Sequence, residues 1–111
     1  MYNDDKIRFL PEWSRGPETA SQRDARLGRQ HLAKGEWDKS MSYLTAAIVF
    51  EPHNGGYWLD LGRALLGMGD SQLARDAWHA GLVWSRHAND ETLAAELEAS
   101  IATLPNADVG V

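Results

Sequence analysis

Two arginines, Arg29 and Arg63, are the side chains whose type and spacing best suit the binding of a charged group. They stand 34 residues apart, and several other positions match at the same distance. If one unit of that length is used twice, the two guanidinium groups should lie side by side on neighbouring units. Guanidinium groups at that spacing can grip a carboxylate through paired hydrogen bonds. The alternative is that both are ordinary solvated arginines on exposed helix faces.

Catalytic and metal-binding patterns are missing from the sequence. The four histidines form no i, i+4 pair and no ligand cluster. Asp60 with His53 or Glu51 could be drawn as an acid and a base, but any helical protein offers such pairs. There is no nucleophile motif, phosphate-binding loop or metal signature. We therefore expect a protein that is not an enzyme and that holds no metal and no cofactor.

Composition limits the possible partners. The chain has 111 residues, which predicts a single domain. Its formal net charge of -5 argues against nucleic acid or an anionic membrane as the partner. Without cysteine, disulfides and thiolate metal sites are excluded. The sequence contains no run of about 18 apolar residues, so it predicts no membrane span. The N-terminus also has no apolar signal core. The default expectation is a cytoplasmic protein.

The sequence repeats itself at an offset of 34 residues. The matching pairs are Leu27-Gly28 with Leu61-Gly62, Leu32 with Leu66, Gly35 with Gly69, Leu44 with Trp78, and Ile48 with Leu82. All fall on apolar, small or turn positions, which indicates one supersecondary unit used twice. A period of this length is typical of paired helices stacked in a solenoid.

The apolar spacing predicts an all-α protein with five helices and no sheet. We expect helix pairs at 19–34 with 37–50 and at 55–67 with 71–85, followed by a last helix at 90–104. Thr19 and Gln22 form a candidate capping box, and Ser71 is expected to cap the fourth helix. The last helix has an apolar stripe and an acidic face, as expected for a cap on a helical stack.

Glycines and large side chains should explain how the helices pack. Gly28 and Gly62 lie inside predicted helices, where glycine costs about 1 kcal/mol relative to alanine, so their recurrence implies a packing reason. They would let a neighbouring helix approach closely, while Leu44 and Trp78 fill the space between paired helices. Trp78 is therefore assigned to the core, as are Trp37 and Trp58.

Residues 1–17 form a segment ahead of the repeats with three large apolar side chains, Phe9, Leu10 and Trp13. An unstructured tail seldom carries three such side chains. We therefore expect this arm to be partly ordered and to pack either on the protein itself or on a second copy, in a possible homodimer. Residues 105–111 are expected to form a disordered tail.

The repeated positions resemble the tetratricopeptide repeat family. The second unit reads Trp58-x-x-Leu61-Gly62-x-x-Leu65, then Gly69-Asp70, Ala74, Trp78 and Gly81. The first reads Leu27-Gly28-x-x-His31, Gly35, Trp37, Ser40, Leu44, Ala47 and Pro52. The resemblance implies a domain at 18–104, with repeats at about 21–54 and 55–88 and a capping helix at 90–104.

The resemblance also implies a function and a surface that performs it. In such repeats, the first helix of each pair lines a concave groove that holds a peptide or a partner helix. Mapped onto this chain, the groove-facing residues are Gln22, Arg26, Arg29 and Ala33, followed by Leu59, Asp60, Arg63 and Leu66. We expect an adaptor or assembly chaperone that binds an acidic or carboxylate-bearing segment of another protein. The alternative is a structural module that self-associates through its arm or repeat edge, without a groove ligand.

Overall fold

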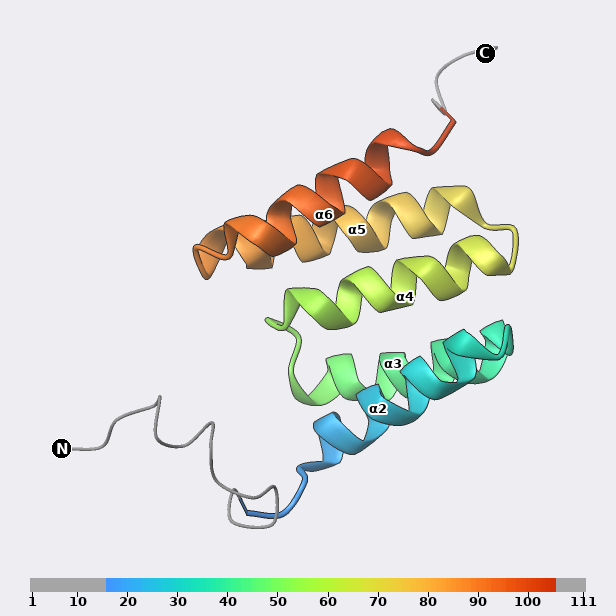
Figure 1. Ribbon diagram of the computed structural model, residues 1–111, viewed down its shortest axis with the longest axis vertical. Helices are drawn as coiled ribbons and strands as arrows, with labels where there is room; N and C mark the ends of the chain where they lie inside the picture. Colours follow the sequence, from blue (N-terminus) through green and yellow to red (C-terminus); the bar gives the residue numbers. More distant parts are fainter. Residues whose placement is uncertain (1–15, 106–111) are drawn as a thin grey trace, which may run out of the picture.

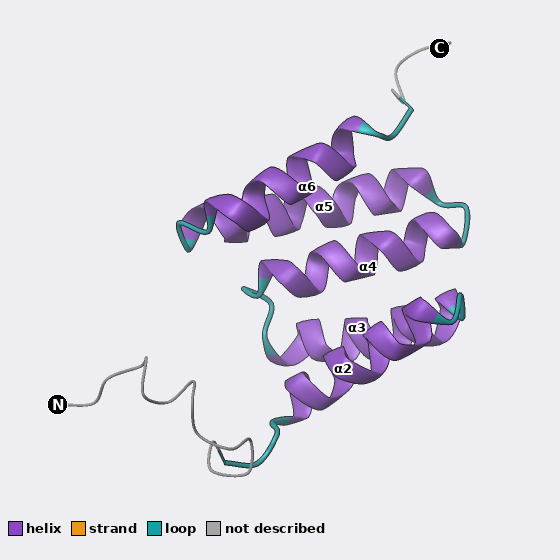
Figure 2. Cartoon of the chain, viewed as in Figure 1, coloured by secondary structure: helices purple, strands orange, loops and turns teal. Residues whose placement is uncertain are grey.

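The computed structural model describes residues 16–105, and these fold into five helices (Figure 1). In order along the chain they are α2 (Ala20–Ala33), α3 (Trp37–Phe50), α4 (Gly55–Gly67), α5 (Ser71–His87) and α6 (Glu91–Ala102). The described part of the chain contains no strand (Figure 2). The all-α fold class is confirmed, and each expected helix lies within about two residues of its observed bounds.

Local sequence signals set where the helices begin and end. The backbone N–H of Thr19 donates to Gln22 Oε1 over 3.0 Å, and the N–H of Gln22 donates to Thr19 Oγ1 over 3.2 Å. This is the expected capping box. The expected cap of α5 was wrong by one residue. Asp70, not Ser71, caps that helix, because its carboxylate accepts the N–H of Leu73 at 3.0 Å.

Helices α2 with α3 and α4 with α5 form two consecutive hairpins that stack on each other (Figure 1). Gly35 and Gly69 occupy the two hairpin turns with φ of 73° and 87°, a conformation that glycine adopts without strain. Helix α3 packs on α4, and α6 packs on α5. Helix α4 also touches both α2 and α6. We call the surface that α2, α4 and α6 share the groove face.

The repeated glycines leave room for large side chains of the facing helix. A Cβ atom on Gly28 would lie 2.7 Å from Cγ of Leu44, and one on Gly62 would overlap the indole of Trp78. Both large side chains are buried, with exposed fractions of 0% for Leu44 and 2% for Trp78. The packing reason inferred for the two glycines is therefore confirmed.

The largest part of the core lies beneath α6. Leu59 and Trp78 of the second pair pack there with Leu97 and Leu104 from the C-terminal end. Leu97 is fully buried, so α6 covers the open side of the second pair. Of the tryptophans assigned to the core, only Trp78 is buried. Trp37 and Trp58 are half-buried, and Trp58 donates from Nε1 to the carbonyl of Pro52 over 2.7 Å.

Some expectations fall on residues that the structure does not describe. Phe9, Leu10 and Trp13 lie outside the described residues, as does the tail from residue 106 onward. The arm therefore stays a prediction, and so do the domain boundaries that depend on it.

Candidate functional site

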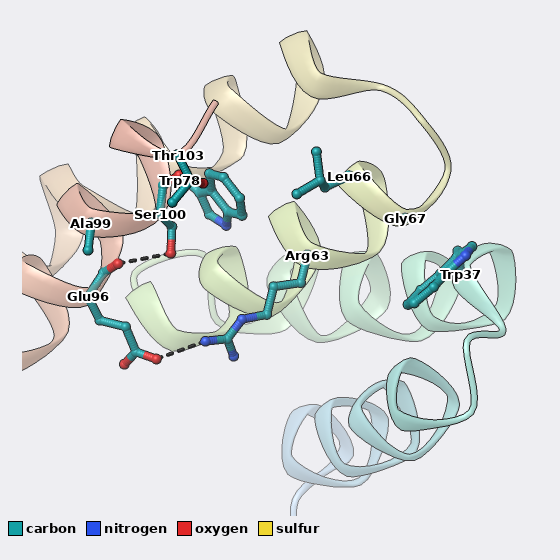
Figure 3. A pocket seen from close by; sticks show the side chains of 9 residues that line it. All are labelled: Trp37, Arg63, Leu66, Gly67, Trp78, Glu96, Ala99, Ser100 and Thr103. Atoms are coloured by element: carbon teal, nitrogen blue, oxygen red, sulfur yellow. Dashed lines mark hydrogen bonds and ion pairs between the residues drawn. The ribbon is translucent and has the colours of Figure 1, made fainter. Parts of the chain in front are cut away.

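Four charged side chains form a row across the groove face. Asp60 of α4 lies between Arg29 of α2, at 3.7 Å, and Arg63 of its own helix, at 3.2 Å. Arg63 also donates from Nη2 to Glu96 Oε1 of α6 over 2.8 Å (Figure 3). Arg29 and Arg63 lie on either side of Asp60, as expected of two arginines at equivalent positions of neighbouring repeats. Both are ion-paired with the same carboxylate, which stands between them.

Asp60 is the buried member of the row. Its side chain is only 11% exposed, while those of Arg29 and Arg63 are 52% and 43% exposed. Burial raises the pKa of Asp60 above its ordinary value, and the two arginines oppose that effect by stabilising the carboxylate. The cations therefore face outward above an anion that a partner cannot reach directly.

An apolar cleft of about 510 Å³ adjoins this row on the groove face. It lies chiefly between α4 and α6, and the side chains that line it include both Arg63 and Glu96 (Figure 3). The other lining residues are Trp37, Leu66, Gly67, Trp78, Ala99, Ser100 and Thr103. The cleft is widely open to solvent, and its lining is mostly apolar with a few charged groups.

The other residues expected in the groove differ in their exposure and in their contacts. Leu66 is 41% exposed and lines the cleft, as a groove residue should. Arg26 is exposed but pairs with Glu18 rather than with the row, over 2.8 Å from Nε to Oε1. The placement of Leu59 was wrong. It is 5% exposed and packs against Trp78 and α6, so it offers no surface to a ligand.

Sequence reasoning missed the contribution of α6 to this site. Glu96, Ala99 and Thr103 recur at helical spacing, but this helix was read only as a cap with acids facing solvent. Treating residues 90–104 as the first helix of a third unit would have placed one side of it on the groove face. Trp37 was also missed as a lining residue, because its match to the repeat assigned it to the core.

The histidines do not form a site within residues 16–105. His31 stacks on Tyr43 with ring centroids 5.4 Å apart and contacts Glu36 Oε1 through Nδ1 at 3.1 Å. That hydrogen bond is the main reason why the pKa of Glu36 is lowered. Across the described chain, no group of three His, Asp or Glu side chains is arranged to hold a metal ion. Glu51 accepts a hydrogen bond from Ser21, and Asp60 is occupied by the arginines.

Comparisons with known proteins bear on the fold alone. No protein-family model matches this chain, and neither does any curated protein. The structure is similar to the solution structure of protein BPP2914 from Bordetella parapertussis, with a TM-score of 0.70 and 24% sequence identity. The likeness covers 92% of this chain and 86% of that one. Among the described helices, none has the length and apolar character needed to cross a membrane.

Proposed function

We propose that this chain is a cytoplasmic, non-catalytic protein-interaction module of the tetratricopeptide repeat type. It serves as an adaptor or assembly chaperone that holds a peptide segment or helix of a partner protein on the groove face. The observation that carries the proposal is the apolar cleft of about 510 Å³ beside two outward-facing arginines. The paired-helix architecture and the repeat motifs support the family assignment.

The charges favour an acidic or carboxylate-bearing segment as the ligand. Arg29 and Arg63 present about half of their side-chain surface to solvent, whereas Asp60 beneath them is covered. Exposed ion pairs contribute only about 0.2–1 kcal/mol each. Micromolar binding requires about 8 kcal/mol. Apolar contact with Leu66 and the cleft must therefore supply most of the affinity, with the arginines setting orientation and selectivity.

Charge reversal on the groove face tests the proposal. The full chain is immobilised, partners are captured from native lysate, and the binding of each is compared with that of the variant Arg29→Glu with Arg63→Glu. We expect that variant to lose its specific partner at least tenfold. The matched control is Lys39→Glu with Arg86→Glu, which reverses two exposed cations that the structure pairs with Glu36 and Glu98 outside the row.

Arg63→Glu places a new carboxylate beside Asp60 and Glu96, so circular dichroism must show that the variant is folded. The pair Arg29→Gln with Arg63→Gln removes the charges without that repulsion and should give a smaller loss in the same direction. A partner whose affinity survives both double variants would show that the groove assignment is wrong.

Self-association is the second candidate function. Val49 and Phe50, on the last turn of α3, are 73% and 63% exposed. That turn adjoins the start of α2 through the hydrogen bond from Ser21 to Glu51. Helix α2 therefore begins near the end of the helix that carries this exposed apolar pair. A dimer in light scattering that dissociates when residues 1–17 are removed would favour this function, whereas a monomer would favour the adaptor.

A further inference from the structure

We propose that Glu96 is an internal competitor for the ligand of the groove face. In the empty groove its carboxylate holds Arg63. The ligand is an acidic protein segment with a large apolar side chain beside a carboxylate, and that carboxylate replaces Glu96 as the apolar side chain enters the cleft. This inference rests on the proposed function and names the chemistry of its partner.

The two ends of the Arg63 guanidinium have different roles. Nη1 donates to Asp60 Oδ1 over 3.2 Å, and Asp60 is buried, so this contact fixes the position of the group. Nη2 donates to Glu96 Oε1 over 2.8 Å. Glu96 is 50% exposed, so its contact can be exchanged at little cost. One end of the guanidinium is therefore anchored, and the other is available to an incoming carboxylate.

Glu96 occupies the position that a ligand carboxylate would take. It is the partner of Arg63 and at the same time part of the lining of the cleft (Figure 3). A ligand that fills the cleft therefore contacts this side chain. An incoming carboxylate replaces the ion pair of Arg63 that it breaks, while Glu96, which is 50% exposed, turns to solvent.

The two exposed arginines of the row are the groups that can bind an anion. Arg29 and Arg63 are the outward-facing cations, and Glu96 is the outward-facing anion among the row residues. Once a ligand carboxylate displaces Glu96, it contacts the exposed end of Arg63, while Asp60 stays paired with both arginines. The apolar lining around Leu66 and Ala99 requires an apolar group to accompany the ligand carboxylate.

The probe for this proposal is the pentapeptide EEWEE, blocked at both ends, titrated into the full ¹⁵N-labelled chain and followed by amide chemical shifts. The control peptides QQWQQ and EEAEE lack the charges and the apolar side chain. We expect EEWEE to bind with shifts centred on α4 and α6. Each control peptide should bind at least about fivefold more weakly.

Two variants separate the competitor from the cleft. Glu96→Gln should raise the affinity for EEWEE about two- to fivefold, the range expected for removing one exposed ion pair, and leave that for QQWQQ unchanged. Ala99→Phe fills the cleft and should reduce binding at least tenfold. Ala95→Phe adds the same side chain at an exposed position on the same helix that does not line the cleft. This control should bind as the parent does.

The outcomes distinguish this inference from the proposed function. If Glu96→Gln leaves EEWEE binding unchanged while Ala99→Phe abolishes it, the cleft binds ligands but Glu96 does not compete, and the inference is wrong. If EEWEE fails to bind, or binds Ala99→Phe as well as Ala95→Phe, the assigned ligand chemistry is wrong. The partner capture with the arginine variants then tests the groove independently.

Discussion

The two helix pairs share one plan but fill it differently. In the first pair, Leu44 packs on Gly28, and Ser40 Oγ donates to the carbonyl of Gly28 over 2.7 Å. In the second, Trp78 packs on Gly62 and donates from Nε1 to the carbonyl of Leu59 over 2.9 Å. Each pair thus combines an apolar filler with a hydrogen bond to the facing helix. In the second pair one residue supplies both, and in the first two residues share the task.

The pairs also differ in what covers them. The second pair lies between α3 and α6, and the cluster of Leu59, Trp78 and Leu97 is closed by α6. Buried polar residues do not distinguish the pairs, since the first buries Ser21 and Ser40 and the second buries Asp60 and Ser85. The first pair has no equivalent of α6 among the described helices. Its apolar contacts with the rest run through α4, where Ile48 meets Tyr57. We infer that the second pair with α6 is the stable half of the fold and that the first pair depends on it.

The largest expected effect is the loss of stability of the second pair when α6 is removed. Deleting residues 88–111 exposes the side of the second pair that carries Leu59, Trp78 and Leu82. Burial of one such side chain contributes about 1.5–3 kcal/mol. Losing the burial of several therefore removes a large part of a typical folding free energy of about 5–15 kcal/mol. Two repeats are also fewer than the three or so usually needed for stable stacking.

We expect the truncated chain to aggregate or to lose its cooperative melting transition, measured by circular dichroism. Deleting only residues 106–111 is the control, and it should leave the melting temperature unchanged. A chain ending at residue 87 that melts like the parent would show that the second pair is stable without its cover.

The matched glycines give a more local test. Gly62→Ala would force its new methyl group into the indole of Trp78, which is rigid and held by its hydrogen bond. Gly28→Ala would meet Leu44 Cγ at 2.7 Å, a less severe overlap than the one with Trp78 Nε1 at Gly62. Overpacking costs about 1–3 kcal/mol, and the helix gains about 1 kcal/mol from alanine.

The expected loss of unfolding free energy is therefore about 1–2 kcal/mol for Gly62→Ala and about 0–1 kcal/mol for Gly28→Ala, measured by urea denaturation. Gly56→Ala, near the start of α4, is the comparison without overpacking of a large side chain, because its new Cβ would lie 3.3 Å from Oδ1 of the capping residue Asn54. Equal losses of unfolding free energy for Gly28→Ala and Gly62→Ala would contradict the idea that the rigid indole makes the second pair less tolerant of an added methyl group.

The sequence predicted the helices well because their signals are local. The offset between Leu27-Gly28 and Leu61-Gly62 fixed the register, and capping residues such as Thr19 fixed the ends. The site was harder to predict. Successive residues on a helix are about 100° apart, so Leu59 and Asp60 could be assigned to the groove when one is core and the other covered. The contact between Arg63 and Glu96 depends on the position of α6 along the axis of α4, and no local sequence pattern predicts that position.

The last and smallest effect concerns Asp60, where the two pairs meet. Its carboxylate contacts Arg29 of the first pair and Arg63 of the second. Burial raises its pKa in the folded state above the ordinary value of about 3.8. Between the unfolded-state and the folded-state pKa, the folded chain therefore binds more protons than the unfolded chain. In that window the contribution of Asp60 to stability falls as the pH rises.

Asp60→Asn removes this titration while keeping the shape of the side chain. Relative to the parent, the variant should be least stable below pH 4 and should recover as the pH rises through the folded pKa, measured by urea denaturation from pH 3.5 to 7. Glu18 and Glu36 act in the opposite direction, because their lowered pKa values make the fold lose stability as the pH falls. They are present in both proteins, so their effects cancel in the difference. If the stability of the parent relative to the variant instead increases as the pH rises, the attraction of the two arginines for the Asp60 carboxylate outweighs the effect of burial. Asp60 would then be a net electrostatic link between the first pair and the second.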